Sequence, residues 1–142
     1  MSSLQHSVDT LQKLVGHPSV SSTSNTAVSE TASEFLTCLG FDVEKTTYLD
    51  PQGVPKMNLV ARRQPTATES TEYGGLAYFC HTDVVPADDW TGPGGDPFKS
   101  VVQEDRIYGR GSCDMKGSLV AMLSAVARLP AKQQRAPLWI VC

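Results

Sequence analysis

A histidine and an aspartate two residues apart follow an apolar segment in the middle of the chain. His81 and Asp83 come directly after residues 76–80, whose apolar side chains predict a buried strand. Side chains two positions apart on an extended chain point to the same side, so both groups can face one site. Open α/β sheets bind their ligands at the carboxyl ends of the strands. The spacing therefore predicts a functional site that contains His81 and Asp83.

A second acidic residue lies in a glycine-rich turn about thirty residues further on. Asp114 lies between Gly111 and Gly117, where a helix is expected to begin. Imidazole and carboxylate groups both bind borderline-soft divalent ions such as Zn²⁺, and a further carboxylate commonly orients the ligating histidine. We therefore predict His81 as a metal ligand, Asp83 as its orienting partner and Asp114 as a ligand able to bridge two ions. A purely structural His–Asp pair remains the alternative.

The same turn resembles two nucleotide-binding patterns but fulfils neither. A Gly-x-Gly-x-x-Asp sequence ends at Asp114, where the dinucleotide-binding motif has a third glycine, and a carboxylate there would repel a pyrophosphate. Lys116 precedes Gly117, whereas the lysine of a phosphate-binding loop follows the glycine. The turn therefore favours a cation. Cys113 is most simply interpreted as a small buried residue, with metal or redox sensitivity as the alternative.

The helices and strands that must position these residues alternate along the chain. Apolar residues at helical spacing predict helices over residues 4–15, 28–39 and 119–129. Apolar runs and β-branched or aromatic residues predict strands over residues 41–49, 58–61, 76–80 and 137–142, with a turn at residues 50–53. Such alternation predicts an α/β fold, in which a mostly parallel twisted sheet has helices on both faces.

Composition and charge exclude several classes of protein. Twelve basic and 15 acidic residues give a net charge of −3 without a basic cluster, so a nucleic-acid partner is not expected. No segment reaches the roughly 18 apolar residues of a membrane span, and the first residues do not resemble a signal peptide. The four cysteines form no Cys-x-x-Cys pair. We therefore expect a cytoplasmic protein with reduced thiols and no membrane partner.

Two ordered motifs resemble the signature of a family of dinuclear zinc metallopeptidases. The first is HTDVVP at residues 81–86, and the second is YGRGSCDMKG at residues 108–117. The family contains acetylornithine deacetylase, succinyl-diaminopimelate desuccinylase, aminoacylase and carboxypeptidases. The resemblance implies that His81 is a metal ligand, that Asp83 is catalytic and that Asp114 bridges two divalent ions, zinc or alternatively cobalt. It implies hydrolysis of an N-acyl amino acid or a small peptide.

The resemblance also implies parts that this sequence lacks. In the family, a Glu-Glu pair that provides a general base and a metal ligand follows the strand that residues 137–142 resemble, and no such pair occurs here. We therefore expect residues 1–142 to be the N-terminal portion of the catalytic domain, inactive alone, of a homodimeric parent. On this expectation, the dimerisation domain and the rest of the catalytic domain lie outside residues 1–142. The alternatives are a non-catalytic remnant that binds at most one ion weakly, or a parent with desuccinylase, aminoacylase, carboxypeptidase or dipeptidase activity.

Overall fold

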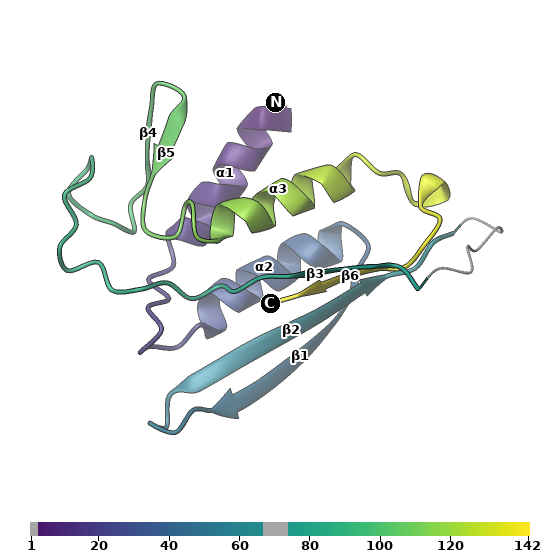
Figure 1. Cartoon of the computed structure of the whole chain (residues 1–142), viewed down its shortest axis with the longest axis horizontal. Coiled ribbons are helices and arrows are strands. Elements are labelled where there is room, and N and C mark those ends of the chain that lie inside the picture. Colours follow the sequence, from purple (N-terminus) through teal and green to yellow (C-terminus); the bar gives the residue numbers. More distant parts are fainter. Residues whose placement is uncertain (1–2, 67–73) are drawn as a thin grey trace.

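The structure, a computed structural model, describes residues 3–66 and 74–142 (Figure 1). The helices are α1 (Ser3–Val15), α2 (Thr26–Cys38) and α3 (Lys116–Ala127), followed by a short 3₁₀ helix (Ala131–Gln133). The strands are β1 (Asp42–Leu49), β2 (Pro55–Arg63), β3 (Leu76–Phe79), β4 (Val101–Gln103), β5 (Arg106–Tyr108) and β6 (Leu138–Val141). Within the described ranges, no helix is both long and apolar enough to cross a membrane.

Four strands form a mixed sheet in the order β1-β2-β6-β3. The predicted α/β class is confirmed, but the parallel character is only partial: β3 and β6 pair in parallel, whereas β2 pairs antiparallel with both β1 and β6. The physical reason lies in the turn at residues 50–53. There the Asp50 carboxylate accepts hydrogen bonds from the amides of Gln52 and Val54, which closes a hairpin. A hairpin joins antiparallel strands.

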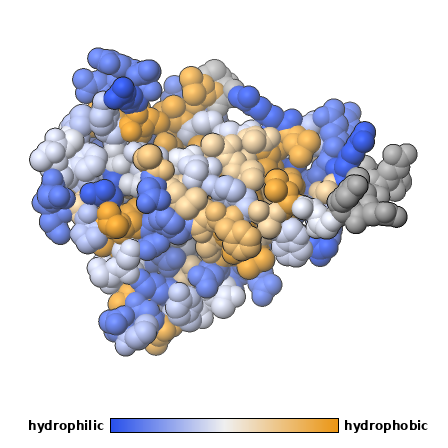
Figure 2. Space-filling view, in the orientation of Figure 1, coloured by the Kyte–Doolittle hydropathy of each residue, from blue (hydrophilic) through white to orange (hydrophobic). Residues whose placement is uncertain are grey.

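The core lies between the helices and one face of this sheet. Alternate residues of β2, namely Met57, Leu59 and Ala61, are buried in the same cluster as the apolar residues of α1, α2 and α3. On the opposite face Phe79 is 69% exposed, and hydrophobic residues gather over β3 and β6 at the centre of the view in Figure 2. The sequence predicts helices on both faces of the sheet, and the described helices cover one of them.

Two connections bring distant segments to the carboxyl end of β3. The chain after β3 forms a parallel bridge between Val84 and Val20, which lies in the loop between α1 and α2. The β4–β5 hairpin leads into the turn before α3. The end of β3 and the beginning of α3 thereby meet, as the predicted site requires.

Candidate metal centre

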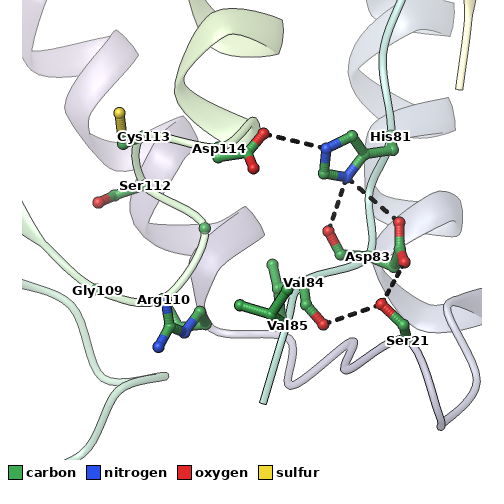
Figure 3. Close-up of a pocket in the computed structure, with 11 residues that line it drawn as sticks. Ser21, His81, Asp83, Val84, Val85, Gly109, Arg110, Ser112, Cys113 and Asp114 are labelled. Carbon is green, nitrogen blue, oxygen red and sulfur yellow. Dashed lines mark hydrogen bonds and ion pairs between the residues drawn. The ribbon is translucent and has the colours of Figure 1, made fainter. Parts of the chain in front are cut away.

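A cavity of about 420 Å³ lies at the carboxyl end of β3 (Figure 3). Its volume falls within the range of ligand-binding pockets, about 300–1,000 Å³. It is lined by the three predicted site residues, His81, Asp83 and Asp114. His81 and Asp114 are 33 positions apart in the sequence, so the fold alone brings them together.

The imidazole of His81 is oriented through its Nδ1 atom. Nδ1 lies 2.9 Å from the backbone carbonyl oxygen of Asp83. Because a carbonyl oxygen can only accept a hydrogen bond, Nδ1 carries the proton and donates it. In the neutral imidazole, Nε2 is then unprotonated, and this nitrogen faces the carboxylate of Asp114 (Figure 3). A histidine that binds a metal ion through Nε2 requires this tautomer.

Asp114 faces His81 from the turn before α3. Its Oδ1 atom lies 3.1 Å from Nε2 of His81, and 84% of its side chain is exposed. Two ligands of one tetrahedral zinc ion, each bound at about 2.0–2.1 Å, lie about 3.3 Å apart. With Nε2 unprotonated both atoms are acceptors, and a cation between them satisfies both. The donor set and its spacing therefore fit a divalent ion.

The described residues contribute part of such a centre. His81 and Asp114 are two donors, whereas a structural zinc site has four ligands and a catalytic one usually has three from the protein. Residues 3–66 and 74–142 contain no group of three or more His, Cys, Asp or Glu side chains that could hold an ion. The ligand roles of His81 and Asp114 therefore stay predictions that this geometry supports.

The charge around His81 favours a cation. Burial by itself lowers the pKa of His81, but the protonated ring can donate to both the Asp83 carbonyl and the Asp114 carboxylate, and these hydrogen bonds, together with the negative charge of both aspartates, raise the pKa above its ordinary value. A negative potential that stabilises the imidazolium also attracts a metal ion to the same position.

Asp83 is held by the loop that follows α1. Its Oδ2 atom accepts a hydrogen bond of 2.6 Å from the hydroxyl of Ser21, and its Oδ1 atom lies 3.3 Å from Nδ1 of His81. Ser21 is fixed in turn, because its amide donates to the Val84 carbonyl at 2.9 Å and Lys56 of β2 donates to the Ser21 carbonyl at 2.8 Å. These contacts join segments 62 and 35 positions apart. No local signal in the sequence could have indicated them.

Glycine shapes the turn that presents Asp114. Gly111 has a φ of +84°, and a Cβ atom there would lie 2.6 Å from Cγ1 of Val84. The amide of Lys116 donates to the Gly111 carbonyl at 3.0 Å and closes the turn, within which the Asp114–Met115 peptide bond is cis. Only a residue without a side chain lets this turn approach the segment after β3 so closely.

Lys116 is fully buried beneath the turn, although its sequence context indicates only a charge at the start of a helix. Its Nζ atom donates to the carbonyl oxygen of His17 at 3.0 Å. Burial lowers the pKa of Lys116 to about 8, although the negative charge of Asp83 acts in the opposite direction. Lysine is rarely buried so completely, which is why the sequence did not indicate this position.

We expect Lys116→Ala to lower the free energy of unfolding by about 2–4 kcal/mol, because it removes a buried stem and one of the two hydrogen bonds that the His17 carbonyl accepts, the other coming from the Ser19 amide. Lys116→Met keeps most of the stem and should destabilise less. Urea unfolding followed by circular dichroism measures both. The exposed Lys99, replaced by alanine, is the control and should change stability by less than about 0.5 kcal/mol. An alanine variant as stable as the unchanged protein would contradict this structural role.

Cys113 is exposed and lines the cavity beside Asp114, so its interpretation as a small buried residue is wrong. The neighbouring Arg110 is braced at the rim of the cavity. Its guanidinium carbon lies 5.9 Å from the ring centroid of Trp90, and its backbone amide donates to the carbonyl oxygen of Pro97 at 2.7 Å. These contacts join the turn before α3 to the long loop before β4.

The sequence matches known proteins over most of its length. Residues 77–142 match the model of peptidase family M20/M25/M40. An acetylornithine deacetylase from Myxococcus xanthus is 35% identical over 133 residues, which make up 93% of this chain and 33% of that protein. The chain therefore spans about a third of the length of this curated relative.

Solved structures show the same fold. Human carnosine dipeptidase 1 superposes with a TM-score of 0.75 at 24% identity, over 96% of this chain and 31% of that one. An M20 family metallo-carboxypeptidase from Sulfolobus solfataricus superposes with a TM-score of 0.69 at 28% identity, over 95% of this chain and 30% of that one. The resemblance indicated by the two motifs is thereby confirmed, because both motifs lie in residues 77–142, which match the model of peptidase family M20/M25/M40.

Proposed function

We propose that the protein to which these residues belong is a metal-dependent amidohydrolase that removes the acyl group from N-acyl amino acids, with N-acetylornithine as the preferred substrate. The observation that carries the proposal is the approach of Nε2 of His81 to Oδ1 of Asp114, 3.1 Å apart at the edge of an open cavity. The relative named acetylornithine deacetylase, 35% identical to this chain, supports the choice of substrate.

The cofactor in this proposal is a pair of divalent ions, most simply zinc. Bound ions of this kind polarise the scissile carbonyl group and lower the pKa of a water molecule toward neutrality. His81 and Asp114 would hold them. The Asp83 carbonyl fixes the His81 tautomer, and the Asp83 carboxylate, 3.3 Å from Nδ1, stabilises the positive charge that the imidazole gains as a ligand.

A carboxypeptidase is the second candidate. The 28% identity to a metallo-carboxypeptidase of the same family favours it, and it would use the same pair of donors on a peptide bond. The two candidates differ in the group on the carbonyl side of the scissile bond. Assays with N-acetylornithine and with dipeptides therefore distinguish them, and zinc-dependent release of acetate from N-acetylornithine is the result we expect.

The isolated chain of 142 residues is, in this proposal, inactive. Two donors in an open cavity bind an ion weakly, and neither is free to act as a general base while it holds the ion. We expect no zinc-dependent hydrolysis of N-acetylornithine by the purified chain alone. Robust turnover would show that the described residues already contain the base and would overturn this part of the proposal.

The experiment that tests the site is Asp83→Ala in the intact protein. We expect kcat to fall about 100-fold with nearly unchanged metal content, because alanine keeps the backbone carbonyl that orients His81 but removes the carboxylate. Steady-state kinetics and elemental analysis measure the two quantities. Ser21→Ala, which leaves the carboxylate but removes its hydroxyl partner, should lower kcat less. Loss of metal in proportion to kcat would contradict the separation of roles.

A further inference from the structure

Two cysteines face each other on the neighbouring strand ends that lead to the site. The last paired residues of the parallel strands β3 and β6 are Phe79 and Val141, so Cys80 and Cys142 are next to one another in register. The amide of Cys80 donates to the Val141 carbonyl at 2.9 Å. The two Sγ atoms lie 3.0 Å apart. This distance is a direct contact between thiols, without room for another atom between them.

The spacing of neighbouring strands is compatible with a disulfide between these two positions. Neighbouring strands lie about 4.7–4.9 Å apart, within the range of about 4.4–6.8 Å between the Cα atoms of bonded cysteines. Cys142 is fixed at this position, since its amide and carbonyl both exchange hydrogen bonds with Leu59 of β2, at 3.0 and 2.8 Å. Closing the gap from 3.0 Å to a bond of about 2.05 Å therefore requires the two sulfur atoms to approach by about 1 Å.

Small oxidants can reach both sulfur atoms. Cys80 and Cys142 are half-buried and line another cavity, of about 320 Å³, which shares His81 and Asp83 with the first. The remaining cysteines, Cys38 and Cys113, are exposed. If exposure alone decided, Cys38 and Cys113 would be the more readily oxidised thiols. Disulfide formation between Cys80 and Cys142 would instead result from the fold, which brings their sulfur atoms together.

We propose that Cys80 and Cys142 are a modification site at which hydrogen peroxide forms an intramolecular disulfide. One thiol attacks a peroxide oxygen and becomes a sulfenic acid with release of water. The second thiol then attacks that sulfur, the S–S bond forms and a second water leaves. In sum, two thiols and one peroxide give one disulfide and two waters, and the two electrons pass from sulfur to peroxide.

The position of the bond gives it a consequence for the site. The disulfide joins β3 to β6 at the residue immediately before His81. It also closes a loop of about 62 residues, which reduces the entropy of the unfolded chain. This inference does not depend on the proposed hydrolase activity, because it needs neither a metal ion nor a substrate.

The test is a count of thiols in the folded chain after exposure to one equivalent of hydrogen peroxide at neutral pH. After quenching with catalase, denaturation and alkylation, we expect two labelled cysteines in place of four, at Cys38 and Cys113, and a mass lower by about 2 Da before labelling. Peptide mapping should find the Cys80–Cys142 cross-link, and dithiothreitol should restore four labels. Four labels after oxidation, or a cross-link between any other pair, would overturn the proposal.

Single variants separate this pair from unspecific oxidation. Cys80→Ser and Cys142→Ser should each abolish the species that is lighter by about 2 Da, whereas the matched controls Cys38→Ser and Cys113→Ser should still form it. Persistence of that species in Cys80→Ser would show that another pair reacts. Because the unchanged chain already gives a decisive count, the proposal remains testable if a serine variant does not fold.

Discussion

Alanine in place of Asp114 should remove most of the bound metal from the intact protein, and alanine in place of His81 should do the same. Each substitution deletes one of two donors that lie 3.1 Å apart, and the remaining donor is then the only ligand that the described residues contribute. Loss of an outer-shell partner typically costs about 10–100-fold in metal affinity or in activity, so loss of a direct ligand should weaken metal affinity by about 100-fold or more. Elemental analysis of dialysed protein and zinc titration calorimetry measure this loss.

Matched controls make this result specific. Asp105 is as exposed as Asp114, with 90% of its side chain accessible, and Asp105→Ala should leave the zinc content unchanged. His6→Ala is the equivalent control for the histidine. Both site variants should keep the circular dichroism spectrum of the unchanged protein, because neither side chain belongs to the core. An unchanged metal content in Asp114→Ala and His81→Ala would refute the ligand assignment.

Gly117→Ala should strongly destabilise the turn that presents Asp114. A Cβ atom at position 117, in the first turn of α3, would overlap the backbone carbonyl oxygen of Ser112. Backbone cannot move aside as a flexible side chain can, so the turn or the helix start must shift. We expect a loss of about 3 kcal/mol or more in the free energy of unfolding, measured by urea denaturation.

Gly74→Ala is the control for this substitution, because a Cβ atom there would meet no atom of residues 3–66 and 74–142 within 4 Å. It should change the free energy of unfolding by less than about 0.5 kcal/mol. The displaced turn in Gly117→Ala should also weaken zinc binding, since Asp114 lies between Ser112 and the substituted residue. A Gly117→Ala protein with unchanged stability would show that the turn has another conformation.

The order and type of the main elements could be predicted because their signals are local. Leu11 and Val15 of α1 lie at helical spacing, and both are buried in the core. The direction in which strands pair could not be inferred from alternation alone. A turn at residues 50–53 is indicated by the sequence, but not that it closes a hairpin and so makes β1 and β2 antiparallel. The antiparallel pairing of β2 with β6 is a contact between distant segments, for which the sequence has no local signal.

The candidate site could be predicted to a similar extent, and for the same reason. His81, Asp83 and Asp114 are indicated by residue type and spacing within short motifs, and the fold brings all three to one cavity. The residues that support them could not be predicted. Ser21 reaches Asp83 across 62 positions, and Lys116 reaches the carbonyl of His17 across 99, so both contacts exist only after the chain has folded.

His81 follows the end of β3 and Asp114 precedes the start of α3, so an ion that binds both residues links ion binding to the folding equilibrium. In the unfolded chain His81 and Asp114 are separated by a flexible segment of 33 positions, and their joint affinity for an ion is lost. An ion that binds both therefore stabilises the native state by mass action, by about 2.7 kcal/mol when its concentration is 100 times its dissociation constant. The melting temperature should then rise with the concentration of zinc, and a chelator should lower the melting temperature without any change in the covalent chain.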